Sequence, residues 1–154
     1  MPARLPAPAA VALVALLGGC GSSDPPRPPT ACTESAQTIE QALGRAPAAV
    51  TLDGGARLSD CVARARSSAD LQTTGLVLTR AADHLAERAQ RGDARAAAAL
   101  GYLVGATRRG AARTTGIQEQ LKRRVEQTAA LLESGGPDVA VALARGIRAG
   151  EATG

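Results

Sequence analysis

Apolar and polar positions alternate with a helical period over most of this chain, from Thr30 to Gly150. Apolar side chains recur three, four or seven residues apart, which places them on one face of an α-helix. Leu71, Leu78 and Leu85 show the pattern most clearly, because they are seven residues apart with small residues between them. The pattern predicts an all-α bundle of five or six short-to-medium helices joined by short loops.

Capping residues and helix breakers divide this pattern into separate helices. A Ser, Thr or Asp marks four of the starts, because its side chain can accept a hydrogen bond from the first turn. Ser67-Ser68 either ends the helix that starts at Ser59 or lies within a helix that continues. A Gly or Pro marks each end. The predicted helices cover residues 33–44, a segment from Ser59 onward, 69–91, 94–109, 116–134 and 138–149. The expected N-caps are Thr33, Ser59, Asp93 and Thr115 (the last in a capping box with Gln118), and the expected last stop is Gly150.

Two local patterns add detail to this bundle. Residues 50–58 alternate around Asp53-Gly54-Gly55, so they form either a small hairpin or an extended loop with a turn. Gly101 and Gly105 lie one helical turn apart in the segment 94–109, and we expect them to allow a close helix crossing.

The first twenty residues follow a different pattern. Arg4 precedes the apolar run 9–17, which is shorter than the ~20 residues that span a bilayer. Leu17-Gly18-Gly19-Cys20 follows at once. This arrangement resembles the leader and lipobox of a bacterial lipoprotein. The alternative is an ordinary secretory signal that is cut elsewhere and gives Cys20 no role.

The lipoprotein resemblance implies a location and a modification. Residues 1–19 would be a cleaved signal peptide, and Cys20 would carry diacylglycerol on its sulfur and, in many bacteria, a further acyl chain such as palmitate on its amine. The chain would then be anchored through Cys20 on the extracytoplasmic face of the cell membrane or in the outer membrane. Gly21 favours the outer membrane, because some inner-membrane lipoproteins carry aspartate there.

A proline- and serine-rich tether, 20–31, separates this cysteine from the predicted helical domain, 32–150. The tether has no large apolar side chain, and its Pro-Pro pairs favour extended polyproline II. At ~3.1 Å per residue, it would hold the domain up to ~30 Å from the bilayer.

The predicted core is thin and invites a covalent link. The chain has no Phe and no Trp, and Tyr102 is its one aromatic residue. If Cys20 carries lipid, Cys32 and Cys61 are the remaining pair, and a disulfide is expected in an exported protein. Such a bridge closes a loop of about 30 residues and contributes ~3.5 kcal/mol on the chain-entropy model. Two buried free thiols are the alternative.

The charge of the chain is mild, with a formal net value of +4. We expect no nucleic-acid partner, because an exported protein rarely meets one. One stretch is nevertheless basic, and it consists of Arg108, Arg109, Arg113, Lys122, Arg123 and Arg124. These residues form either a solvated helix face or a surface for an anionic membrane, where each could contribute ~1 kcal/mol.

Catalytic patterns are not found in the sequence. His84 is the single histidine, and Ser67-Ser68 has no evident base. Asp53 and Asp60 are a conceivable carboxylate pair for glycan cleavage, but we expect them to stabilise a turn and a helix start. The sequence therefore predicts no catalytic residue, no metal site and no cofactor, and an envelope hydrolase is the least favoured function.

Two hypotheses of function follow. The first is an interaction or accessory module of the cell envelope, held by its anchor and docking to a protein partner. The second is a binding module for a small apolar ligand, with a crevice opened by Gly75, Gly101 and Gly105.

Overall fold

The computed structural model describes residues 27–114, 116–132 and 136–154. Six α-helices follow one another here: α1 (Ala36–Leu43), α2 (Leu58–Arg64), α3 (Ser68–Gln90), α4 (Ala94–Ala111), α5 (Glu119–Ala130) and α6 (Pro137–Thr153). Two short 3₁₀ turns accompany them, η1 (Thr30–Cys32) and η2 (Asp53–Gly55). The described residues contain no strand, which confirms the predicted all-α bundle. The segment 50–58 is accordingly an extended loop with a turn.

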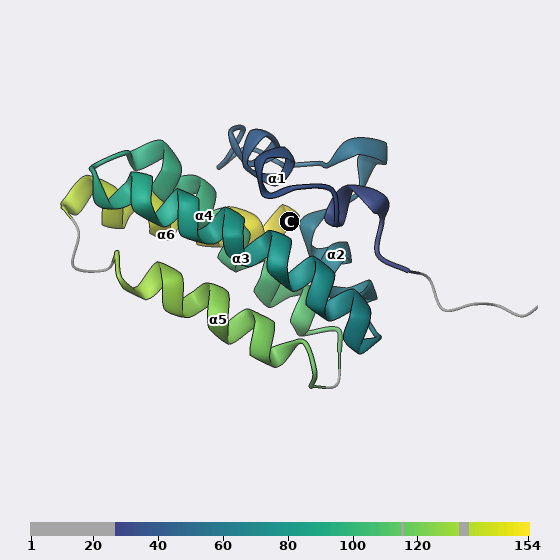
Figure 1. Cartoon of the computed structure of the whole chain (residues 1–154). Coiled ribbons are helices and arrows are strands. Elements are labelled where there is room, and N and C mark those ends of the chain that lie inside the picture. The colour runs from purple at the N-terminus through teal and green to yellow at the C-terminus, as the bar shows by residue number, and fades with distance from the viewer. Residues whose placement is uncertain (1–26, 115, 133–135) are drawn as a thin grey trace, which may run out of the picture.

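Helix α4 is the centre of this bundle (Figure 1). It packs against each of the other five helices, and every residue from Ala96 to Thr107 is buried. A helix that is apolar all round is normally buried, and small side chains let its neighbours approach on several sides. A run of alanines and glycines thus replaces the large aromatic side chains that the chain lacks.

The closest helix pair is α4 with α6, and glycines on both helices make it possible. A methyl group at Gly101 would overlap the backbone of Leu143, and one at Gly146 would overlap the backbone of Ala98. Four residues further along each helix, Gly105 and Gly150 make the same kind of contact. Because the contacts advance toward the C-terminus on both helices, α4 and α6 run parallel. The predicted close crossing at Gly101 and Gly105 is confirmed, and α6 is the helix that crosses there.

Two buried hydroxyl groups connect the loops to this helix pair. The Tyr102 hydroxyl accepts a hydrogen bond from the Val50 amide (3.0 Å) and lies 2.9 Å from the Thr153 hydroxyl. Ser59 donates a hydrogen bond of 2.6 Å to the Gly154 carbonyl. The one aromatic side chain therefore joins the 50–58 loop and the end of α6 to α4.

A disulfide between Cys32 and Cys61 joins η1 to α2, as the sequence predicted. The two Cα atoms are 5.5 Å apart, and both residues are fully buried. The bridge fixes the start of the described chain to a helix that packs directly on α4. Among the described helices, none is both long enough and apolar enough to cross a bilayer.

Several predicted helix ends are wrong, because the expected capping residues make other contacts or the helix continues past the expected stop. Ser35 caps α1 instead of Thr33, because Thr33 instead bonds back to the carbonyl of Thr30. Ser59 lies inside α2, where its hydroxyl bonds to Gly154 and caps nothing. Gly150 does not end the last helix, since α6 continues to Thr153.

The start of the fifth helix also differs from the prediction. Helix α5 begins at Glu119, and the Gln118 side chain donates to the Ala65 carbonyl (2.8 Å) instead of joining a capping box. Thr115, its predicted partner, lies outside the described residues. In the sequence, Ile117, Leu121, Val125, Thr128 and Leu132 recur at helical spacing, which predicts one apolar face of the helix 116–134. Ile117 instead precedes the helix and is 55 % exposed. By contrast, Asp93 caps α4 as predicted, accepting from the amides of Arg95 and Ala96.

Candidate functional site

An open groove of about 460 Å³ lies between α3 and the N-terminal half of α5. Its apolar walls are Leu71, Leu76, Ile117 and Leu121, with Gly75 between them. Its polar lining is Ser68, Gln72, Thr79 and Gln120. Leu78 and Leu85, further along α3, are buried in the core as the heptad spacing predicts, whereas Leu71 is half-buried. The apolar face of α3 therefore continues past the core into the groove.

Gly75 determines how deep this groove is. A methyl group placed on Gly75 would meet the Cδ1 atom of Leu121 at 3.6 Å, an ordinary van der Waals contact. A larger side chain would occupy the groove itself. Gly101 and Gly105, the other two glycines expected to open a crevice, are covered by the backbone of α6. Of the three, only Gly75 lines a cavity found in the described part of the chain.

Two large apolar side chains at this groove are exposed to solvent. Leu76 is 51 % exposed and Ile117 is 55 % exposed, on facing walls of the groove. Single exposed leucines are common on proteins, but apolar residues that converge on a groove mark binding surfaces more often. Sequence reasoning pointed to Gly75 but missed Ile117, because Ile117 fits the apolar repeat of the following helix and was placed on its apolar face.

A smaller basic cavity of about 320 Å³ adjoins the groove at Ile117. Arg66, Arg113, Thr114 and Gln118 complete its lining. Gln118 is buried, and its Oε1 atom has no hydrogen-bond partner among the described residues. Arg113 lies 3.6 Å from an Asp60 carboxylate oxygen, and no ion pair with a described residue involves Arg66.

The charged residues that line these two cavities are all arginines, although Arg113 is paired with Asp60 behind the cavity wall. Arg124 is the one charged residue that lines the groove, and Arg66 and Arg113 are the charged residues of the basic cavity. Three carboxylates near these cavities or further along the same helices have partners. Asp70 accepts from the Ser67 amide in the α3 capping box, Glu119 pairs with Lys122, and Asp83 accepts from Thr128.

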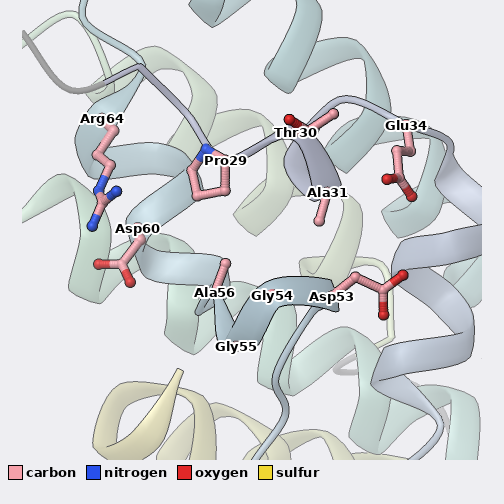
Figure 2. A pocket seen from close by; sticks show the side chains of 10 residues that line it. All are labelled: Pro29, Thr30, Ala31, Glu34, Asp53, Gly54, Gly55, Ala56, Asp60 and Arg64. Atoms are coloured by element: carbon pink, nitrogen blue, oxygen red, sulfur yellow. The ribbon is translucent and has the colours of Figure 1, made fainter.

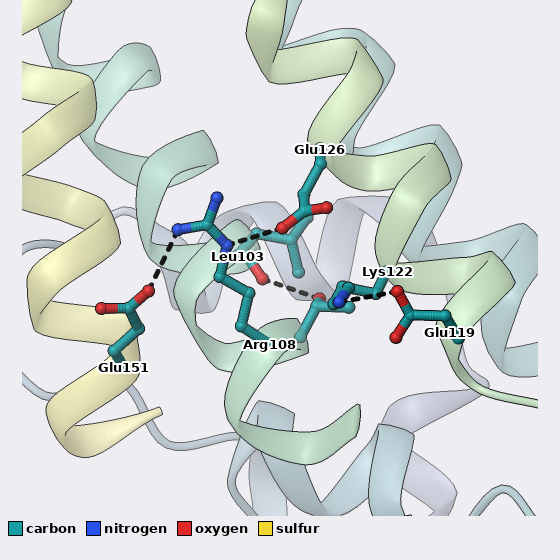
Figure 3. Close-up of polar contacts among 7 residues, drawn as sticks. Leu103, Arg108, Glu119, Lys122, Glu126 and Glu151 are labelled. Atoms are coloured by element: carbon teal, nitrogen blue, oxygen red, sulfur yellow. Dashed lines mark hydrogen bonds and ion pairs between the residues drawn. The ribbon is translucent and has the colours of Figure 1, made fainter. Parts of the chain in front are cut away.

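The predicted basic residues do not form one patch. Arg108 joins three helices, because it bonds to Glu126 of α5 (2.7 Å) and to Glu151 of α6 (3.1 Å), as Figure 3 shows. The hydrogen bond to Glu126 is the main reason that the pKa of Arg108 is raised above its usual value. Arg109 donates to the carbonyls of Glu151 and Ala152 at the end of α6, where a cation is favoured.

The other basic residues of that stretch point to different neighbours. Lys122 pairs with Glu119 at 2.7 Å, within α5. Arg123 and Arg124 are both exposed on α5, and neither has an ion pair with a described residue. Of the predicted set, the structure therefore places Arg124 at the groove and Arg113 at its basic end.

A third cavity, of about 590 Å³, lies at the base of the tether (Figure 2). Asp60 and Arg64 lie on one side, and Asp53 and Glu34 lie on the other. Asp53 and Glu34 are exposed, whereas a catalytic acid is normally made effective by burial or by a close partner. No group of three His, Cys, Asp or Glu residues in the described chain is placed to hold a metal ion.

The remaining candidates have structural contacts. His84 Nδ1 lies 2.8 Å from Glu40, so it links α3 to α1 at the surface. Ser67 accepts from the Asp70 amide at 3.0 Å and caps α3. Cys20 lies outside the described residues.

The groove and its basic end are thus described by their geometry and chemistry alone. Comparisons with protein-family models, with curated proteins and with solved structures found nothing that matches this chain.

Proposed function

We propose that this chain is an envelope lipoprotein, anchored through Cys20, that serves as an interaction module and docks a protein partner in the α3/α5 groove. The observation that carries the docking half is the groove itself, with Leu76 and Ile117 exposed on facing walls. The lipobox at Cys20 and the proline-rich tether support the anchor. The disulfide suits an oxidising compartment.

The groove suits a protein partner better than a small apolar ligand. Ligand pockets normally enclose most of the surface of the molecule they hold. This cavity is an open groove, and Ser68, Gln72, Thr79 and Gln120 line it beside the leucines. A hydrocarbon chain would remain partly in water and would satisfy none of those polar groups.

The anchor is tested by labelling with a palmitate analogue in a bacterial host. We expect the full chain to take up the label and to sediment with membranes. Cys20→Ala should take up no label and should remain in the supernatant when membranes are sedimented. Equal labelling of both forms would contradict lipidation at Cys20.

Docking is tested by purifying the wild-type protein and two variants of Gly75 from detergent extracts and identifying what co-purifies with each. Gly75→Ala leaves the groove open, whereas Gly75→Leu fills it. We expect a stoichiometric polypeptide with the wild type and with Gly75→Ala, and its loss from Gly75→Leu. A partner that stays bound to Gly75→Leu, or no partner with any form, would contradict docking in this groove. Far-UV circular dichroism checks that both variants are folded.

A further inference from the structure

We infer that the occupant of the α3/α5 groove is an amphipathic helix of a partner protein, with acidic residues at both ends of a short apolar face. This inference rests on the proposed docking function and specifies the chemistry of the partner.

The groove has the length of about three helical turns. Ser68 and Thr79 line its two ends on α3, and at 1.5 Å per residue they are about 16 Å apart. A helix that lies in such a groove contacts it through residues spaced i, i+3 or i+4, and i+7. Leu71, Leu76, Ile117 and Leu121 provide the apolar surface for those contacts.

The positive charges lie at the two ends of this groove. Helices α3 and α5 run parallel, because Gly75 faces Leu121 and Asp83 bonds to Thr128 further along. Arg124 therefore lies level with the Thr79 end. Arg66 and Arg113 line the basic cavity at the other end, beyond Ile117. A partner with carboxylates about three turns apart would match both ends.

This charge distribution disfavours a second copy of the same chain. Neither the groove nor the basic cavity has a carboxylate among its lining residues. A symmetric dimer through this face would bring arginine against arginine, which costs free energy at a contact that excludes water. The occupant must supply the negative charge from a different surface.

The polar lining disfavours a lipid chain as the occupant. Gln72 and Gln120 have side-chain amides that donate and accept hydrogen bonds, and Ser68 and Thr79 have hydroxyl groups. A polypeptide can satisfy these groups with its own polar side chains, whereas an acyl chain cannot.

The test uses three stapled helical peptides with one leucine face and different flanking residues, either Glu, Gln or Lys. The full chain is held in phosphatidylcholine nanodiscs, and affinity is measured by fluorescence anisotropy. We expect the Glu-flanked peptide to bind at least tenfold more tightly than the Lys-flanked peptide. Gly75→Leu should weaken the binding of the Glu-flanked peptide at least tenfold, whereas Gly75→Ala should not.

Charge reversal tests the two ends of the groove directly. The double variant Arg66→Glu with Arg124→Glu should reverse the preference, so that the Lys-flanked peptide binds more tightly. Arg95→Glu, an exposed arginine on α4 that lines neither cavity, is the matched control and should keep the Glu preference. Equal affinities for the Glu and Lys peptides would overturn the inference.

Two further outcomes separate this inference from the proposed function. Binding to phosphatidylglycerol vesicles that Gly75→Leu abolishes would make the occupant an anionic lipid and would overturn the inference. If Gly75→Leu loses the co-purified partner but the peptides show no acidic preference, docking in the groove stands and only the inference of an acidic helix is wrong. Loss of both would remove the docking function itself.

Discussion

At the scale of single residues, glycine has two different uses in this protein. Gly101, Gly105, Gly146 and Gly150 allow the backbones of α4 and α6 to touch, and no side chain fits there. Gly75 lies instead at the floor of a groove, where a methyl group is tolerated. The same residue type in the same secondary structure thus serves the core at one place and the candidate site at another.

This difference predicts opposite effects of one substitution. Gly101→Ala should destabilise the fold by about 3 kcal/mol, because α6 must move away from α4. Gly75→Ala should stabilise it by up to about 1 kcal/mol, because alanine is the better helix former and finds space. Urea unfolding followed by far-UV circular dichroism measures both. Similar changes at the two positions would show that α4 and α6 do not pack as described.

At the scale of elements, local signals predicted the interiors of the helices well. The long helix α3 and the Asp93 cap of α4 follow from the apolar repeat and from capping chemistry. The Cys32–Cys61 bridge followed from cysteine count and compartment. These features depend on neighbours in sequence or on a single available pair, so the sequence is sufficient for them.

Predicted helix ends are wrong where the expected capping side chain bonds to a distant residue instead. Ser59 bonds to Gly154, 95 residues away, and Gln118 bonds to Ala65, 53 residues away. Gly150 was interpreted as a stop, although its spacing of four from Gly146 repeats that of Gly101 and Gly105. That repeated spacing could have identified α6 as the partner of α4.

The candidate site was only partly predictable for the same reason. Gly75 was singled out in sequence as a residue that could open space, and it lines the groove. Ile117 was misassigned, because the start of α5 depends on the long-range bond of Gln118. The pairing of Arg108 with Glu126 and Glu151 also depends on which helices are neighbours, which the linear pattern does not contain.

At the scale of the whole molecule, the closest helix contact and the candidate site belong to different helix pairs. The α4/α6 pair forms a closed contact of backbone against backbone, and α3 and α5 leave an open groove between them. The disulfide joins the base of the tether to α2, and α2 is followed in the chain by Arg66 and α3. The arrangement suits a domain that is held at one end and presents a groove to a partner.

Thiol accessibility on the cell tests this arrangement most directly. Cys32 and Cys61 form a buried disulfide, so neither reacts with a maleimide. If Cys20 carries lipid, it has no free thiol either, and a cysteine introduced at the surface is the thiol that the reagent labels. Leu76→Cys places the thiol in the groove. Val141→Cys, at a side chain that is 59 % exposed on α6, is the matched control for Leu76, which is 51 % exposed.

The measurement compares the labelling rates of Leu76→Cys and Val141→Cys by a membrane-impermeant maleimide, on intact spheroplasts and on purified protein. We expect the two purified variants to be labelled at similar rates. On spheroplasts, Val141→Cys should be labelled and Leu76→Cys should be protected at least tenfold, with protection lost when Gly75→Leu is added. Equal labelling of the two variants on spheroplasts would contradict an occupied groove, and no labelling of Val141→Cys would contradict the extracytoplasmic anchor.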